Sequence, residues 1–332
     1  MTVCFGEILL RLSPPGSLRV AQADSFDAVY GGAETNVALA LSGFGDPASV
    51  VTRLPDSEIG RACLGTVRRW GADTSRILTG GGRMGIYFLE KGASLRPSKV
   101  IYDRRDSAFA LSAPEMYDWE KILSGADAFF FTGITPALSD ALPGIVSDAL
   151  DVCKKRGIPV WCDVNYRSAL WSAESAGAVM RSLVRGIDTL IVNEEHAALL
   201  FGIAGEGEDP DARFSSMARQ LCSEYGIRRI ALTFRLSESS EINTVSGALW
   251  DGGEMIRSRS YRVPIVDRVG GGDAFSAGLI HGTLHGWDAR RTLEFAAAAN
   301  ALKHSVHGDF LVATEEEVDR LASSDGTVRM IR

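Results

Sequence analysis

Residues 267–278 read DRVGGGDAFSAG and join two segments of different periodicity. The preceding SYRVPIV alternates bulky side chains as a β-strand does, whereas Phe275 and Leu279 lie four positions apart, as on one face of a helix. The glycines are therefore predicted to form a strand-to-helix turn, where free amides and the positive end of the helix dipole favour an anion. Asp273, in the first helical turn, is placed to accept a proton beside that anion. The alternative interpretation of the same residues is a structural glycine turn in which Asp273 only caps the helix.

Short apolar runs alternate with helical patterns along most of the chain. The strand-like runs are VCFGEILL, ASVVTRL, AFFFTGI, IPVWCDVN, TLIVNEE and RIALTFR. Buried strands that alternate with helices predict an α/β fold, a doubly wound and mostly parallel sheet flanked by helices. Residues 1–12, 33–78 and 111–332 are assigned to this core.

Two regions, 13–32 and 79–110, break the alternation. MGIYFLE and SKVIYDRR in the second region are short and strand-like, with no helix between them. We therefore predict a small β-sheet that packs over one side of the core as a lid. The GGGRMG run in this region has G-x-G-x-x-G spacing at Gly80, Gly82 and Gly85. A strand pattern follows it where a dinucleotide fingerprint needs a helix, so a turn is predicted instead of a nicotinamide site.

Composition narrows the class of protein. The 332 residues carry a net charge of −7 without a Lys/Arg block, which argues against nucleic-acid or membrane partners. Five cysteines without C-x-x-C spacing indicate reduced thiols, and no signal-peptide pattern is found, so a cytoplasmic location is expected. His281 and His285 lie four apart in the predicted helix, but no neighbouring Glu or Cys completes a metal set. We predict that they pack or face solvent.

The opening stretch resembles the D-T-x-G-A-G-D-x-F-x-x-G signature of the ribokinase-like (PfkB-type) carbohydrate kinases, with Arg268 in place of Thr and Gly271 in place of Ala. A second family signature, two glycines followed by N-x-A, appears as GGAETNVALAL some 240 residues earlier. The resemblance implies a ribokinase-like fold and a sugar kinase. It implies that Asp273 is the catalytic base, that the anion hole is Gly270, Gly271 and Gly272, and that the sugar contacts include Gly31, Gly32 and Asn36.

Three further stretches resemble the 2-keto-3-deoxygluconate kinases within this family. They are VIYDRRDSA, DVNYRSALW and KHSVHGDF. A sugar acid carries a carboxylate, which the planar fork of arginine binds through paired hydrogen bonds. Ordinary surface or salt-bridged arginines are the alternative. The predicted substrate contacts from these stretches and the lid are Tyr87, Tyr102, Arg104, Asn165, Arg167, Asp309 and the base Asp273.

The nucleotide site is predicted from the same resemblance. ATP and Mg²⁺ are implied, and so is a monovalent cation such as K⁺ near Asp267. IVNEEH matches the family's N-x-x-E element at Asn193, but His196 stands where Glu is expected, so the metal ligands stay unassigned. The predicted nucleotide contacts are Asn165, Asn193, Thr233, Arg235, Gly270, Gly272 and Asn300.

The resulting hypothesis is phosphoryl transfer from ATP to 2-keto-3-deoxygluconate, which gives the 6-phosphate. Two alternatives stay open: a PfkB-type kinase for fructose, ribose or a related keto-deoxy acid, and a non-catalytic sugar sensor on the same fold. Because lids of this family often pair between subunits, a homodimer through the lid is expected.

Overall fold

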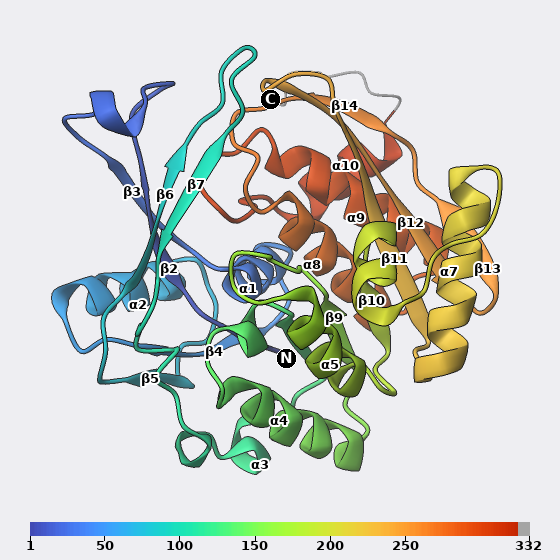
Figure 1. The fold of residues 1–332 in the computed structure, drawn as a ribbon, viewed down its shortest axis with the longest axis horizontal. Helices are drawn as coiled ribbons and strands as arrows, with labels where there is room; N and C mark the ends of the chain where they lie inside the picture. The colour runs from blue at the N-terminus through green and yellow to red at the C-terminus, as the bar shows by residue number, and fades with distance from the viewer. Residues whose placement is uncertain (325–332) are drawn as a thin grey trace.

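The computed structural model describes residues 1–324 and contains two sheets (Figure 1). Residues 325–332, which the predicted core included, lie outside the described residues. The larger sheet has ten strands in the order β13-β12-β11-β10-β9-β8-β1-β4-β5, with β14 also paired to β12. Its strands are β1 (Thr2–Phe5), β4 (Ala48–Leu54), β5 (Ile77–Thr79), β8 (Ala128–Thr132), β9 (Val160–Asp163), β10 (Thr189–Ile191), β11 (Arg229–Ser237), β12 (Ile242–Asp251), β13 (Glu254–Arg257) and β14 (Tyr261–Pro264).

All pairs from β5 to β11 in the larger sheet are parallel, and β12 pairs antiparallel with each of its neighbours. Chain order reverses at β1, where Thr2 pairs with Ala48 of β4 on one side and with Ala128 of β8 on the other. In such sheets ligands bind at the carboxyl ends of the strands beside this switch point. The predicted fold, a mostly parallel sheet flanked by helices, is confirmed.

Helices cover both faces of this sheet because successive strand residues point to opposite sides. Val3 and Phe5 join one buried cluster, whereas Cys4 between them joins another. On the first face lie α3, α4, α5 and α7, and on the second α1, α2, α8, α9 and α10. The helices are α1 (Ala33–Gly43), α2 (Glu58–Arg69), α3 (Trp119–Ile122), α4 (Leu142–Arg156), α5 (Ala173–Leu183), α6 (Glu194–His196), α7 (Pro210–Tyr225), α8 (Gly271–Leu284), α9 (Ala289–Lys303) and α10 (Glu315–Ser323).

Several helices begin and end where local chemistry dictates. The Asp209 side chain accepts a hydrogen bond from the Ala212 amide at the start of α7. The same helix ends at Gly226 with a left-handed φ of 68°, a conformation that glycine adopts readily. The central helix α8 has almost no polar face, and ten of its residues are buried. This helix therefore lies inside the molecule, packed between α1 and α9.

The smaller sheet has the order β3-β2-β6-β7 and stands beside the core in Figure 1. Its strands are β2 (Leu9–Ser13), β3 (Asp27–Gly31), β6 (Gly85–Glu90) and β7 (Lys99–Asp103). The sequence placed residues 1–12 in the core, and this boundary is wrong, because Leu9 pairs with Gly31 and with Gly85 in the small sheet. The chain runs from β1 into β2 without a turn signal, which is why the sequence did not show the boundary.

The GGGRMG segment is a turn, as predicted. Gly80, Gly81 and Gly82 all have positive φ angles, and β6 follows them at Gly85. The absence of a helix here excludes the dinucleotide fingerprint. Among residues 1–324, no helix has the length and apolar character needed to cross a membrane.

Candidate active site

A cavity of about 640 Å³ opens between the carboxyl ends of the parallel strands, the start of α8 and the small sheet. Residues that follow β1, β9 and β10 line one side together with residues 232–235 of β11, and β6 and β7 line the other. The predicted sugar, phosphate and nucleotide residues all line this one cavity: Gly31, Gly32, Asn36, Tyr87, Tyr102, Arg104, Asn165, Arg167, Asn193, Thr233, Arg235, Gly270, Gly271, Gly272, Asp273, Asn300 and Asp309.

The glycine turn forms the start of α8. Gly270 is the N-cap residue with φ 83° and ψ 5°, a left-handed conformation that disfavours other residues. A Cβ atom at Gly270 would also overlap the Asp309 carbonyl oxygen. Gly272 differs, since a Cβ there would have no heavy atom within 4 Å. The first amides of a helix have no intrahelical acceptor, so this turn presents donors and a positive dipole end to the cavity.

Asp273 lies in the first turn of α8 and is partly exposed to the cavity. Its Oδ2 accepts a hydrogen bond of 2.6 Å from Nδ2 of Asn36, which comes from α1. Burial raises the pKa of Asp273 to about 7, against the opposing effect of the Asn36 hydrogen bond, and the negative charges of Asp163 and Glu34 add to the rise. A carboxylate with such a pKa is matched to general-base work near neutral pH.

Asp309 and Tyr87 belong to a buried polar network. Tyr87 donates its hydroxyl hydrogen bond to Oδ2 of Asp309, whose Oδ1 lies 2.8 Å from the Arg11 guanidinium. Arg11 also donates to Oδ2 of Asp267 at 2.5 Å. Arg11 comes from β2 of the small sheet and Asp267 from the core, so this network joins the two sheets beneath the cavity.

Arg104 reaches the cavity from the small sheet but already has a carboxylate partner. Its Nε lies 2.7 Å from Oε2 of Glu7, a buried residue that follows β1. Oε1 of Glu7 has no hydrogen-bond partner among residues 1–324. The Arg104 guanidinium also lies 5.5 Å from the centroid of the Tyr102 ring. Arg167 is exposed and reaches the cavity from the loop after β9, opposite the small sheet.

The loop after β9 carries two further polar groups. Asn165 has a φ of 37°, a left-handed conformation that Asn tolerates better than most residues, and its amide donates to Oδ1 of Asp163 at 3.0 Å. Burial raises the pKa of Asp163 to about 6, although the charge of Arg167 opposes the rise. A strained backbone conformation persists only where the surrounding structure fixes it, and such residues are concentrated at functional sites.

The predicted nucleotide residues surround the other part of the cavity. Asn193 uses its Oδ1 to cap α6, where it accepts the His196 amide at 2.7 Å. His196 itself lines the cavity, whereas Glu194 pairs with Arg213 at 3.4 Å. Burial lowers the pKa of His196, which favours the neutral imidazole. Arg235 and Arg268 both line the cavity, and burial together with the charge of Arg235 lowers the pKa of Arg268.

The sequence did not single out several cavity residues. Arg268 was noted only as a departure from the family signature, although its charge faces the same space as the glycine turn. Glu34 is buried in the first turn of α1, and its carboxylate accepts hydrogen bonds of 2.7 and 2.8 Å from the hydroxyls of Thr132 and Thr135. The sequence signal that could have identified such residues is a charged side chain within or beside an apolar run. Those missed in or beside the cavity are Glu7, Arg11, Glu34, Arg268 and Lys303.

Comparison with known proteins fits this geometry. The model of the pfkB family of carbohydrate kinases matches residues 1–316. The chain is 47% identical to the 2-dehydro-3-deoxygluconokinase of Thermotoga maritima, whose crystal structure superposes with a TM-score of 0.95 over 97% of this chain and 99% of that one.

Two relatives by sequence extend the comparison. A 2-dehydro-3-deoxygalactonokinase of Haloferax volcanii is 33% identical over 96% of this chain and 95% of its own length. A 2-dehydro-3-deoxygluconokinase of Thermoproteus tenax is 31% identical over 92% and 89% of the two chains. With both family signatures in one cavity and a family match along nearly the whole chain, the protein belongs to the pfkB family of carbohydrate kinases.

Proposed function

We propose that this kinase transfers the γ-phosphoryl group of ATP to the terminal hydroxyl of 2-keto-3-deoxygluconate and forms 2-keto-3-deoxy-6-phosphogluconate. The observation that carries the proposal is the pairing of Asp273 with the glycine turn at the start of α8, in the same cavity as Arg104 and Arg167. The first part is suited to phosphoryl transfer to a hydroxyl. The two arginines are suited to a substrate with a carboxylate.

In the proposed reaction Asp273 takes the proton of the attacking hydroxyl. The hydroxyl oxygen forms a bond to the γ-phosphorus, the bond between this phosphorus and the β–γ bridging oxygen breaks, and ADP leaves. The amides of Gly270, Gly271 and Gly272 hold the charge on the phosphoryl oxygens, which needs close approach and no covalent help. Asn36 fixes the Asp273 carboxylate through its 2.6 Å hydrogen bond, so that the second oxygen faces the substrate.

The substrate side of the cavity supports a sugar acid. Arg104 is held by Glu7 through Nε and Nη2, which leaves Nη1 donors for a substrate carboxylate. Oε1 of Glu7, which has no hydrogen-bond partner among the described residues, is placed to accept a sugar hydroxyl. Arg167 and Asn165 face this region from the opposite side, and Tyr102 and Tyr87 line its wall. Gly31, Gly32 and Asp309 complete the proposed sugar site.

The nucleotide side supports a polyphosphate. Arg235 and Arg268 provide positive charge, and Thr233, Asn193 and Asn300 provide polar groups along the same wall. Mg²⁺ bound together with ATP would neutralise charge on its phosphates. Oδ1 of Asn300 has no hydrogen-bond partner in the described part of the chain, which leaves it free to accept one from the nucleotide.

The test is ADP release with ATP and Mg²⁺ against 2-keto-3-deoxygluconate, its galacto epimer, fructose, ribose and gluconate. Turnover restricted to the keto-deoxy acids supports the arginine site. Preference for the galacto epimer would favour the second candidate, the activity in the name of the Haloferax volcanii relative. Preference for fructose or ribose would leave Asp273 as the base and remove the carboxylate role of Arg104 and Arg167. Sugar binding without ADP release would make the protein a sensor.

We further propose that the small sheet closes the cavity as a lid and pairs with a second copy of the chain. Its face opposite the cavity is apolar, with Phe26 in ring contact with Phe88 and with Ile101 41% exposed on the edge strand β7. An apolar face on an edge strand needs a cover in solution. Sedimentation of the wild type is expected to give a dimer, and Ile101→Lys a monomer. A monomeric wild type would contradict the proposal.

Positively charged side chains of the protein already lie near Asp267, where a monovalent cation was expected. Oδ2 of Asp267 accepts from Arg11 at 2.5 Å and from the Gly308 amide at 3.2 Å, and its Oδ1 accepts from the Val269 amide at 3.3 Å. The Lys303 ammonium is fully buried nearby and further lowers the pKa of Asp267. We propose that the positive charges of Arg11 and Lys303 take the place of the K⁺ ion that the family resemblance implies near Asp267.

A further inference from the structure

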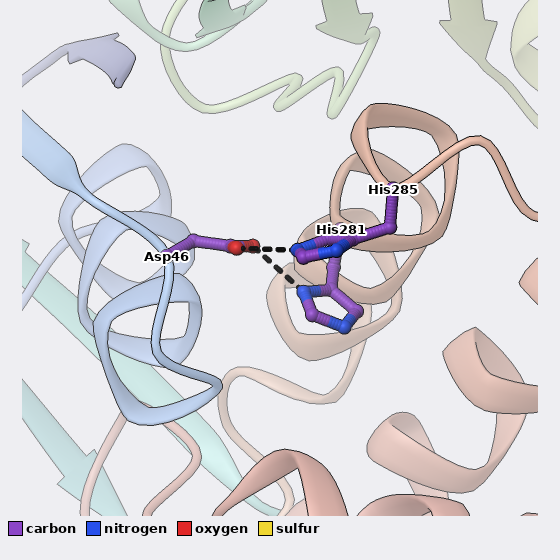
Figure 2. A group of neighbouring side chains, drawn as sticks. All are labelled: Asp46, His281 and His285. Carbon is purple, nitrogen blue, oxygen red and sulfur yellow. Dashed lines mark hydrogen bonds and ion pairs between the residues drawn. The ribbon is translucent and has the colours of Figure 1, made fainter.

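Three side chains from distant parts of the sequence meet at the C-terminal end of α8 (Figure 2). His281 lies in the last turn of this helix, and His285 is its C-cap residue. Asp46 lies in the turn between α1 and β4. Oδ2 of Asp46 is 2.7 Å from Nδ1 of His281, and Oδ1 is 2.9 Å from Nε2 of His285. The carboxylate that the sequence did not show beside the two histidines therefore comes from a residue 235 positions away.

These three groups have the chemistry and spacing of a metal-ligand set. One nitrogen from each imidazole and one carboxylate oxygen lie within 4.8 Å of one another. In a tetrahedral site with metal–ligand bonds of about 2.0–2.1 Å, neighbouring ligand atoms are about 3.3 Å apart. The observed separations are therefore shorter by about 0.6 Å at His281 and about 0.4 Å at His285. Rotation of the exposed His285 side chain can open the second gap, whereas the first requires a small shift of Asp46 in its turn. We propose that Asp46, His281 and His285 bind a divalent transition-metal ion of the Zn²⁺ type.

The unsatisfied ring nitrogen of His281 supports this assignment. The His281 side chain is fully buried, and its Nε2 has no hydrogen-bond partner in the part of the chain that the structure describes. This atom lies 3.8 Å from Oε2 of Glu315 at the start of α10. If Nδ1 binds a metal, the ring proton must lie on Nε2, where it faces a carboxylate. Metal-bound histidines commonly donate their second ring N–H to such a group. Without a metal, a neutral ring that donates from Nδ1 to Asp46 turns a bare lone pair toward Glu315.

The surroundings of the cluster fit a bound cation in two ways. The C-terminal end of α8 carries the negative end of the helix dipole, which favours positive charge. The rings of Phe44, Trp287 and Phe295 lie 4.9–5.4 Å from the His281 ring and hold it in place. His285 is 47% exposed, which gives an ion a path from solvent and leaves room for water as a further ligand. The oxygen and imidazole ligands suit Zn²⁺ or Co²⁺ better than Mg²⁺.

The experiment is calorimetric titration of the chelator-treated full chain with Zn²⁺ near neutral pH. We expect one ion per chain with micromolar or tighter affinity. His285→Gln is the main variant because this side chain is exposed and its loss leaves the core intact. It should weaken binding at least about 10-fold, the lower range seen when even an outer-shell partner is lost. The matched control is His307→Gln, an exposed histidine outside the cluster, and it should bind Zn²⁺ as the wild type does.

A second measurement keeps the result independent of folding. Zn²⁺ should raise the Tm of the wild type and of His307→Gln, but not the Tm of His285→Gln, because an ion that binds only the native state stabilises it. Absence of micromolar binding by the wild type would overturn the proposal. The three side chains would then be joined only by hydrogen bonds, with protons between the Asp46 oxygens and the two imidazoles. Equal affinity of the wild type and His285→Gln would also overturn it.

Discussion

The two ends of α8 are built for opposite charges and were assembled in different ways. At the N-terminal end, Gly270 and Asp273 are three residues apart in the sequence and face the cavity, where the helix dipole favours a phosphate. At the C-terminal end, His281 and His285 need Asp46 from another element before they form a set suited to a cation. The same backbone dipole serves both ends. The difference is that one end is encoded by neighbouring residues and the other by tertiary contact.

The largest expected effect lies at the N-terminal end. Asp273→Asn keeps the shape of the side chain and removes the proton acceptor, so kcat should fall by about 10²–10⁴-fold while sugar binding stays nearly intact. Steady-state ADP release and calorimetric sugar binding measure the two quantities. Asp148→Asn, the same change at an exposed position of α4, is the control and should leave kcat unchanged. Retained turnover in Asp273→Asn would show that the helix start binds an anion without a base.

Two alanine substitutions at the start of α8 distinguish the role of the glycines in the backbone conformation from their role in anion binding. Gly270→Ala forces a side chain into a left-handed position against the Asp309 carbonyl oxygen, with a cost of at least about 1–2 kcal/mol in the free energy of unfolding. The displaced amides should lower kcat by about 10²–10³-fold, the effect of losing one oxyanion donor. Gly272→Ala meets no atom within 4 Å and should leave the Tm unchanged.

Thermal unfolding and ADP release on both glycine variants give the answer. If Gly272→Ala loses kcat but not stability, a phosphoryl group packs against this position in the working enzyme. If Gly270→Ala is as active and as stable as the wild type, the turn is not the anion site.

The cationic wall of the cavity should contribute less than the helix start. Arg104→Ala removes a charged hydrogen bond to the sugar carboxylate, worth about 1.5–3 kcal/mol, and should raise KM for the acid sugar about 10–100-fold. Arg83→Ala, in the turn before β6, is the matched control, because its bidentate pair with Asp103 lies at the surface. An unchanged KM in Arg104→Ala would mean that this residue serves only to pair with Glu7.

The raised pKa of Asp273 predicts the pH profile. Only the ionised carboxylate can accept the hydroxyl proton, so kcat/KM should be level above about pH 8, reach half of that level near the Asp273 pKa of about 7, and fall further as pH decreases. Below that value the fall should approach about tenfold per pH unit, as expected for one essential base. The profile measured on the wild type checks this. An acid limb centred near pH 4 would place the base in a more polar environment than the structure gives it.

The smallest effect is expected for monovalent ions. If Arg11 and Lys303 already neutralise Asp267, exchange of K⁺ for tetramethylammonium at constant ionic strength should leave kcat unchanged. Activity assays in the two salts test this. Specific activation by K⁺ would restore the cation site that the family resemblance implies.

The amino-acid sequence alone predicted the layered α/β fold and the helix that starts at the glycine turn. These features depend on short-range patterns: strand and helix periodicity, glycine where φ is positive, and free amides at a helix start. The boundary at Leu9 was missed because β1 and β2 belong to different sheets but are only three residues apart, in one nearly continuous apolar run.

Only the tertiary structure decided which charges meet. Glu7 pairs with Arg104, Arg11 joins Asp267 to Asp309, and Asp46 reaches His281, each across at least 97 residues of sequence. Such pairs depend on which strand and helix ends are adjacent after the whole sheet has formed. Burial then gives them their strength, because a charge away from water must find a partner or change its pKa. A sequence read locally contains the groups but not their distances.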